Sequence, residues 1–183
     1  VAQAVFAAEH FTGKALDADM LIPAVSRQLR HELANISIIG MPGCGKSTIG
    51  RALAKTLGKT YVDLDEVIEK NTGMPIPDIF AREGEASFRK YESQAVAEIS
   101  KQTRQVIACG GGVIKTEATM QALSRNGIIV WIDRDLSLLY SSSDRPLASN
   151  IEQVKQLYEQ RRPLYRMYSD IIVENNGTVE QCI

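Results

Sequence analysis

Residues 40–48 read GMPGCGKST and contain the pattern GxxxxGKS. The pattern follows a short apolar run at residues 36–39 and leads directly into a helical pattern at residues 47–57, which is the context that a phosphate-binding loop requires. In such a loop, glycines let backbone N–H groups curl around the phosphates, while Lys46 brings a positive charge to the γ-phosphate and the Ser47 hydroxyl binds magnesium. The stretch therefore predicts a nucleotide site; the alternative is a glycine turn that merely caps a helix.

Apolar runs of strand length alternate with helical patterns from residue 35 onward. The strand-like runs are residues 36–39, 61–64, 106–109, 128–132 and 171–173. The helical patterns are residues 47–57, 65–71, 85–100, 117–124 and 152–162. Because the runs are short and rich in β-branched residues, we expect strands that are buried on both faces. The alternation predicts a three-layer α/β/α P-loop fold with a five-stranded parallel sheet, in which ligands bind at the carboxyl ends of the strands.

The first 34 residues differ from this pattern. They predict two helices joined by a loop around residues 13–19, so we expect a helical extension at residues 1–34 and a main domain at residues 35–183. The chain opens at Val1 without an initiator methionine, and Thr178 is placed to cap a helix that the chain would contain only in part. We therefore expect the chain to be cut from a longer polypeptide.

The composition excludes several classes of partner. The chain has 21 basic and 22 acidic residues and no run of lysine or arginine, so we expect no nucleic-acid partner. The three cysteines, Cys44, Cys109 and Cys182, form no CxxC pair, which fits a reduced, cytoplasmic setting. The longest apolar run, residues 128–132, is far shorter than the roughly 20 residues of a membrane span. No NKxD-like tetrapeptide follows the loop, and this favours ATP over GTP.

Two carboxylates follow the second predicted strand. Asp63 and Asp65 are two residues apart, so on a strand both side chains would share one face and point towards the phosphates. One would hold magnesium, and the other would accept a proton from an attacking hydroxyl. In the alternative interpretation, Asp65 is the N-cap of the next helix and Asp63 only ends the strand.

Three further segments carry polar or glycine-rich signals. Arg89 precedes Glu92 by three residues, close enough for the carboxylate to fix the guanidinium, although such pairs are usually solvated surface bridges. Residues 110–112 are three glycines after a strand, which predicts a surface where a ligand touches the backbone rather than a simple turn. Residues 141–147, which include Arg145, form either a lid over the phosphates or an ordinary connection.

Taken in order, these motifs resemble shikimate kinase, in the nucleoside-monophosphate-kinase-like branch of P-loop proteins. The resemblance runs from about residue 36 to residue 173, roughly three-quarters of the chain. It rests on the phosphate loop, the Asp-x-Asp, the Phe-Arg at Arg89, the triple glycine, the Arg-Pro-Leu at Arg145 and the Arg-x-Pro-Leu-Tyr at Arg161. It implies phosphorylation of the 3-hydroxyl of shikimate by ATP with Mg²⁺, in the chorismate and aromatic amino acid pathway.

The resemblance also implies roles for individual residues. The ATP contacts would be Gly43, Cys44, Gly45, Lys46, Ser47, Thr48 and Arg145. Ser47 and Asp63 would serve magnesium, and the catalytic residues would be Asp65, Lys46 and Arg145. The substrate contacts would be Asp65, Arg89, Gly110, Gly111, Gly112 and Arg161. Two arginines suit one carboxylate, because each guanidinium offers a forked pair of donors.

Two stretches depart from the family pattern. Family members often carry arginines on both sides of the adenine, but here residues 138–141 read LLYS and residues 175–178 read NNGT. We therefore expect no stacking of adenine between arginines, and either a low ATP affinity or an affinity that rests on backbone contacts.

The N-terminal segment carries a second resemblance. Residues 1–5, VAQAV, followed by residues 11–13, FTG, are similar to the closing helices of shikimate dehydrogenase. This implies a parent chain that fuses the dehydrogenase to the kinase; the alternative is an unrelated helical extension. For the main domain, the competing hypotheses are a related small-molecule kinase, such as a gluconate kinase, and a nucleotide-binding regulatory module without catalysis.

Overall fold

The computed structural model describes residues 1–140 and 151–182, and the chain divides into two compact units, Val1–Ala34 and Asn35–Ile183. In the first unit, helix α1 (Ala2–Thr12) ends at Gly13, whose left-handed backbone returns its N–H to Glu9 O. Helix α2 (Ala18–Leu33) begins where the Asp17 side chain accepts a hydrogen bond from Met20 N, which satisfies one of the free N–H groups of the first turn. The unit therefore consists of the two helices that the apolar spacing predicts.

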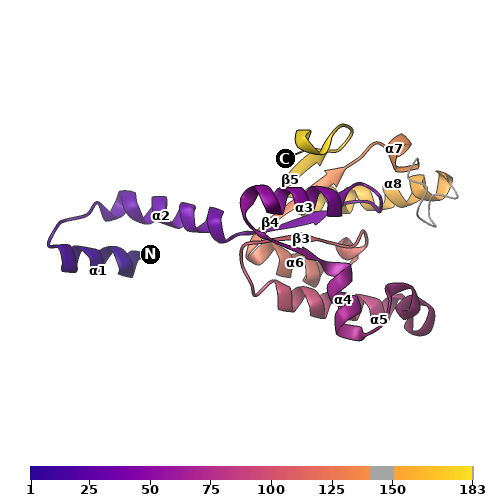
Figure 1. The fold of residues 1–183 in the computed structure, drawn as a ribbon, viewed down its shortest axis with the longest axis horizontal. Helices are drawn as coiled ribbons and strands as arrows, with labels where there is room; N and C mark the ends of the chain where they lie inside the picture. Colours follow the sequence, from indigo (N-terminus) through magenta and orange to yellow (C-terminus); the bar gives the residue numbers. More distant parts are fainter. Residues whose placement is uncertain (141–150, 183) are drawn as a thin grey trace. The chain divides into compact units, whose positions relative to one another are not determined.

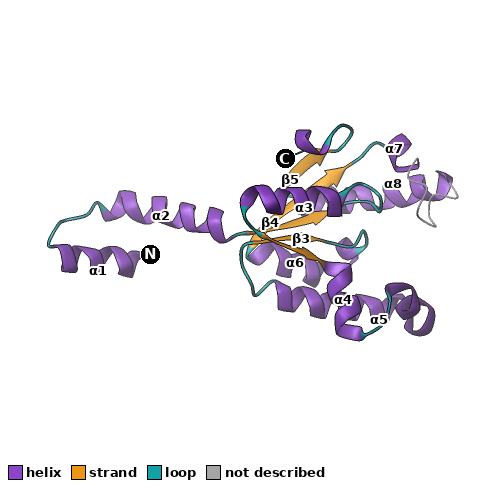
Figure 2. Ribbon diagram, viewed as in Figure 1, coloured by secondary structure: helices purple, strands orange, loops and turns teal. Residues whose placement is uncertain are grey.

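The second unit is built on one parallel sheet. Its strands are β1 (Asn35–Ile39), β2 (Thr60–Asp63), β3 (Gln105–Ala108), β4 (Gly127–Asp133) and β5 (Ile171–Glu174). They lie in the order β2-β3-β1-β4-β5, and every neighbouring pair is parallel (Figure 2). The predicted five-stranded parallel sheet is therefore confirmed, and all five carboxyl ends open on the same edge.

Helices cover both faces of this sheet. Helix α3 (Lys46–Leu57) packs over the strands on one face, whereas α5 (Ile76–Ile99) and α6 (Glu117–Arg125) lie on the other (Figure 1). The remaining helical segments of the unit are α4 (Leu64–Thr72), η1 (Val113–Lys115), α7 (Leu136–Tyr140), α8 (Ile151–Tyr168) and η3 (Val179–Gln181). This arrangement is the predicted three-layer α/β/α fold. Within the described residues, no helix is long and apolar enough to cross a membrane.

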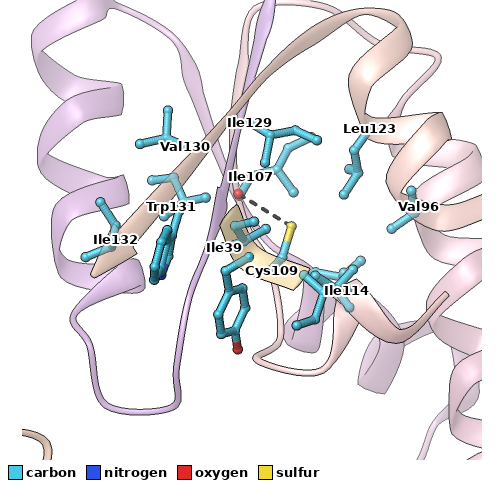
Figure 3. Close-up of a cluster of buried hydrophobic side chains, with 14 of the residues drawn as sticks. Ile39, Val96, Ile107, Cys109, Ile114, Leu123, Ile129, Val130, Trp131 and Ile132 are labelled. Carbon is cyan, nitrogen blue, oxygen red and sulfur yellow. Dashed lines mark hydrogen bonds between the residues drawn. The ribbon is translucent and has the colours of Figure 1, made fainter. Parts of the chain in front are cut away.

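The core lies between the sheet and its helices. Side chains of the three central strands meet Val96 of α5, Ile114 of η1 and Leu123 of α6 (Figure 3). Trp131 of β4 stacks on Tyr165 of α8 with ring centroids 5.8 Å apart, and both side chains are buried. Tyr165 thereby fixes α8 against the end of the sheet that carries the ligand-binding loops.

Several boundaries differ from the expectations. Leu64 is not the end of a strand but the first residue of α4. Helix α5 begins at Ile76 rather than at residue 85, with a kink at Gly84 (φ 80°) where the backbone leaves the helical region. Helix α8 runs through Pro163 to Tyr168 instead of ending at residue 162, because a proline removes one backbone donor but the rest of the helix stays hydrogen-bonded and packed.

The prediction that all strands are buried on both faces is correct only in the middle of the sheet. β1 and β3 are buried along their whole length. β5 is an edge strand, and Ile171 and Ile172 on it remain 46% and 42% exposed. After β5, Thr178 caps the short helix η3 through a reciprocal capping box with Gln181. The predicted lid, residues 141–147, lies outside the described residues.

Candidate active site

The phosphate loop joins β1 to α3, as the sequence pattern predicts. Gly45 is the N-cap of α3 and has φ 95°, a conformation that a residue with a Cβ adopts only under strain. Lys46 is almost buried, and its ammonium donates to Gly40 O at 3.0 Å and to Met41 O at 2.9 Å. The lysine is therefore folded back along the loop, with its charge at the place where phosphates would lie. Ser47 and Thr48 are exposed in the first turn of α3, whereas Cys44 is buried.

Asp63 lies beside the loop and accepts three hydrogen bonds. Ser47 Oγ donates to its Oδ2 at 3.3 Å and Tyr61 OH donates to the same oxygen at 3.0 Å. Asp65 N donates to its Oδ1 at 3.2 Å, which makes Asp63 the N-cap of α4. Partial burial, together with the neighbouring carboxylate, raises the pKa of Tyr61 to about 12, so this phenol stays a donor at neutral pH.

The Ser47 and Asp63 oxygens fit a magnesium ion that also takes oxygens from phosphates and water. The Ser47 hydroxyl and the Asp63 carboxylate both offer hard oxygen ligands, which Mg²⁺ prefers, and the two oxygens are close enough to bind one ion. Among the described residues, no group of three or more histidine, cysteine, aspartate or glutamate side chains is placed to hold a metal alone. An ion at this position would therefore depend on the bound nucleotide for most of its ligands.

The interpretation of Asp63 and Asp65 as two residues on one strand face is wrong. β2 ends at Asp63, and Asp65 lies in the first turn of α4. The alternative is correct that Asp63 ends the strand but wrong that Asp65 caps the helix, because Asp63 takes that role too. The strand-to-helix turn sends the two carboxylates in different directions: Asp63 towards Ser47, and Asp65 towards Gly110.

Each glycine of the triple-glycine loop lies close to at least one polar side chain from elsewhere in the chain; Gly110 also faces Glu92, and Gly111 also lies against the Pro42 ring. A Cβ on Gly110 would lie 3.1 Å from Asp65 Oδ1, and one on Gly111 would lie 3.3 Å from Arg161 Nη1. A Cβ on Gly112 would overlap the Arg89 guanidinium. The loop is glycine-rich because these groups approach the backbone closely, since none of the three glycines has a positive φ.

Arg89 is held by carboxylates of its own helix. Its Nη1 donates to Glu92 Oε2 at 2.7 Å and its Nη2 to Glu85 Oε1 at 3.1 Å. Glu92 is fully buried, and this burial raises the pKa of its carboxyl although the Arg89 charge acts in the opposite direction. Lys115 pairs with Glu85 at 2.6 Å, which lowers the pKa of Glu85. Arg89 and Glu92 therefore do not form a solvated surface ion pair. Glu92 instead holds the Arg89 guanidinium in place against the glycine loop.

Arg161 reaches the same loop from α8. Its Nη1 donates to Gly111 O at 3.0 Å, and Tyr165 OH donates to the same carbonyl at 2.5 Å. Arg161 Nε is buried and has no hydrogen-bond partner among the described residues. Burial raises the pKa of Tyr165, so its hydroxyl remains a donor. Two arginines from separate helices thus converge on one backbone loop.

A pocket that the sequence analysis missed lies beside the phosphate loop. It opens at the carboxyl ends of β4 and β5 and has a volume of about 440 Å³. Its lining includes Arg134, Arg162, Tyr158, Asp133, Asp135 and Glu174. A Cβ on Gly45 would lie 3.9 Å from Arg134 Nη1, so this side chain borders both the pocket and the loop. The polar run Asp133-Arg134-Asp135 directly after a predicted strand was the available signal.

The predicted residues fall on two sides of the sheet's carboxyl edge. Residues 43–48 and Asp63 lie on the phosphate side, and Asp65, Arg89, Arg161 and the three glycines lie together on the other. Arg145 lies outside the described residues. A loop built for phosphates that adjoins a cationic site for a second, anionic molecule defines the class as a P-loop phosphotransferase of small molecules.

Comparisons with known proteins narrow this class. The family model "Shikimate kinase" matches residues 42–183. The shikimate kinase of Clostridium botulinum (strain Alaska E43 / Type E3) is 41% identical over 152 residues, which cover 81% of this chain and 92% of the relative. The chain therefore belongs to the shikimate kinase family. The main domain's expected resemblance to shikimate kinase is confirmed.

Solved structures agree with the assignment. A shikimate kinase from Acinetobacter baumannii in complex with shikimate has a TM-score of 0.76 at 34% identity, covering 85% of this chain and 90% of that one. The shikimate kinase from Aquifex aeolicus has a TM-score of 0.72 at 33% identity, covering 81% and 90%. A gluconokinase from Sinorhizobium meliloti 1021, with a TM-score of 0.51 at 14% identity, shares the fold alone.

Proposed function

We propose that the chain transfers the γ-phosphoryl group of ATP to the 3-hydroxyl of shikimate, giving ADP and 3-phosphoshikimate. Family membership supports this reaction, and ATP and Mg²⁺ are what the family requires. The observation that carries the proposal is the convergence of Asp65, Arg161 and Arg89 on three consecutive glycines. An acceptor that has both a carboxylate and hydroxyl groups matches this set, because the arginines bind the acid and the aspartate binds a hydroxyl.

On the acceptor side, Arg89 and Arg161 clamp the carboxylate of shikimate. Glu92 fixes the Arg89 guanidinium, so this arginine is already oriented before the acid arrives. Arg161 binds the carboxylate through guanidinium donors other than the one that Gly111 O accepts. Asp65 accepts a hydrogen bond from the 3-hydroxyl and takes its proton as the new P–O bond forms.

On the donor side, backbone N–H groups of residues 43–48 hold the phosphates. Lys46 keeps its ammonium between the loop carbonyls and the γ-phosphate, where it offsets the charge that is transferred. Ser47 and Asp63 would hold Mg²⁺, which would offset the negative charge of the phosphates when bound. We propose that Arg145 adds a further contact with the phosphates. The pocket at β4 and β5 takes the nucleoside, with Arg134 and Arg162 on its walls.

The test of this function is ADP release with and without the acceptor. Purified chain, ATP and Mg²⁺ should release ADP at a rate that rises with shikimate and saturates. Gluconate at the same concentrations should support little turnover, because the chain is 41% identical to a shikimate kinase but only 14% identical to the gluconokinase that shares its fold. Equal ADP release in the presence and absence of shikimate would refute the proposal, and preference for gluconate would redirect it to another acceptor.

We also propose that residues 1–34 are the end of a shikimate dehydrogenase fused to the kinase, in a cytoplasmic protein. The segment forms a compact unit by itself, and the match to the family model begins only at residue 42. The free Cys44, Cys109 and Cys182 fit a reducing compartment. Deleting residues 1–34 should leave kinase turnover within a few-fold of the parent. Loss of folding on deletion would instead assign the segment to the kinase core.

A further inference from the structure

A buried asparagine ties the end of the sheet to the phosphate loop. Asn175 follows β5 directly and is 5% exposed. Its backbone N–H donates to Asp133 O at 2.7 Å, which fixes the residue to the end of β4. Its side-chain Nδ2 donates to Cys44 O at 2.8 Å, across 131 positions of the sequence. Cys182 Sγ donates to the remaining amide oxygen at 3.4 Å.

The contact also occupies the space where residue 45 would carry a side chain. A Cβ on Gly45 would lie 2.6 Å from Asn175 Nδ2, closer than such atoms approach in proteins. Gly45 has a left-handed backbone at this point and begins α3. The glycine of the phosphate loop and Asn175 therefore depend on each other: the glycine leaves room for the amide, and the amide holds the peptide group before the glycine.

Because the peptide bond is planar, the hydrogen bond to Cys44 O fixes the orientation of the whole Cys44–Gly45 peptide unit. In a trans peptide unit the C=O and N–H groups point in opposite directions. A donor that holds Cys44 O therefore directs the N–H of Gly45 away from Asn175, towards the side of the loop that receives phosphates. A peptide unit next to a glycine rotates easily, so the loop gains from an external anchor at this position.

We propose that Asn175 is a positioning residue for ATP binding, which holds the Cys44–Gly45 peptide unit with its N–H towards the phosphates. The residue does not touch the reacting atoms. It acts through the phosphate loop and sets the geometry of that loop before the nucleotide arrives. The inference rests on the proposed use of ATP and adds a residue outside the phosphate-loop motif to the nucleotide site.

The test compares Asn175→Ala with a matched variant, Asn35→Ala. Asn35 is also buried and also uses both ends of its amide, donating to Gln102 O at 2.8 Å and accepting from Gln105 N at 3.0 Å. It lies at the amino end of β1, so its loss should lower stability without changing the phosphate loop. The readouts are KM for ATP, KM for shikimate and the thermal shift that ATP with Mg²⁺ produces.

Asn175→Ala should raise KM for ATP by about tenfold, the effect of losing one well-placed hydrogen bond, and leave KM for shikimate within about twofold. Asn35→Ala should lower the melting temperature and leave both KM values near the parent's. Asn175→Ser, whose side chain is shorter by one atom, carries the same expectation if the alanine variant folds poorly.

Two outcomes would overturn the inference while leaving the kinase intact. One is a parental KM for ATP in both Asn175 variants. The other is an equal rise in KM for ATP in Asn175→Ala and Asn35→Ala, which would show a general loss of stability. A parent protein that shows no thermal shift with ATP and no shikimate-dependent turnover would instead refute the proposed function itself.

Discussion

Asp63 and Asp65 are close in sequence but serve opposite sides of the site. Asp63 accepts hydrogen bonds from Ser47, Tyr61 and the backbone, so its charge is fixed beside the phosphate loop. Asp65 faces Gly110 instead. The next two glycines of the same loop, Gly111 and Gly112, lie against Arg161 and Arg89. The turn from β2 into α4 creates this separation, because the residue that ends the strand also caps the helix.

Replacing each aspartate by asparagine should therefore cause different defects. Asp65→Asn keeps the shape but cannot accept the hydroxyl proton, so kcat should fall by about 10²- to 10⁴-fold. Asp63→Asn keeps an oxygen for the helix cap and removes charge from the metal site, so activity should depend more steeply on Mg²⁺ concentration. Steady-state kinetics across a magnesium series checks both; near-parental kcat in Asp65→Asn would remove this residue from the chemistry.

The buried carboxyl of Glu92 makes the free energy of unfolding depend on pH. Burial raises the pKa of its carboxyl in the folded chain above the ordinary value of about 4.3, so the folded state binds this proton more tightly than the unfolded state. The stability that Glu92 contributes relative to glutamine is thus fully present below the ordinary pKa and is lost as the pH rises through the folded value. The difference in free energy of unfolding, parent minus Glu92→Gln, should fall as the pH rises.

Glu85→Gln provides a control of opposite sign. The bond from Lys115 lowers the pKa of Glu85, so its contribution is present above the ordinary pKa and is lost as the pH falls through the folded value. Denaturant unfolding of the parent and both variants between about pH 4 and pH 8 measures the two trends. A parent-minus-Glu92→Gln difference that stays constant or rises with pH would contradict the assigned burial effect.

At the scale of elements, the triple-glycine loop after β3 organises the acceptor side. Helices α4, α5 and α8 all place polar side chains against this loop: Asp65 from α4, Glu92 and Arg89 from α5, and Arg161 from α8. Helices α4 and α5 also contact each other directly, and the loop backbone is the surface that the side chains of all three helices share. Tyr165, buried against Trp131, fixes α8 at the height where Arg161 reaches Gly111 O.

Gly112→Ala should disturb this arrangement through Arg89. A methyl group at position 112 would occupy the place of the guanidinium, so KM for shikimate should rise by about tenfold while KM for ATP changes little. Gly58→Ala is the control: Gly58 ends α3 at φ 60° with open space around it, so the variant should lose about 1–2 kcal/mol of stability and keep both KM values. Unchanged KM for shikimate in Gly112→Ala would argue against a role for Arg89 in binding the acid.

The sequence predicted the elements well but not their junctions. The apolar runs identified the five strands and the GxxxxGKS motif identified the phosphate loop, because both signals are local. The sequence pattern extended β2 over Leu64, since a buried leucine in the first turn of a helix looks like the end of a buried strand. The sequence pattern also ended α8 at Arg162, before Pro163, because proline usually stops a helix and only the packing of Tyr165 shows why this one continues.

The kinase unit presents two adjoining subsites along one edge of its sheet. Arg161 faces the glycine loop, whereas Arg162, the next residue on α8, lines the pocket at β4 and β5. The sequence predicted the first arginine through its motif but gave no sign of the second. Arg161 and Arg162 reach different subsites because of the way α8 packs against the rest of the unit. The residue pattern of one helix does not show how that helix packs.

These neighbouring arginines provide the most direct test of the two-subsite arrangement. Arg161→Ala should raise KM for shikimate by about 10- to 100-fold, as expected for a lost charge-assisted contact of about 1.5–3 kcal/mol, with KM for ATP near the parent's. Arg162→Ala should raise KM for ATP and leave KM for shikimate within about twofold. Steady-state kinetics of both variants with each substrate varied is the measurement. If Arg161→Ala raised KM for ATP instead, or if both variants affected both substrates equally, the assignment of the acceptor and nucleotide sides would be wrong.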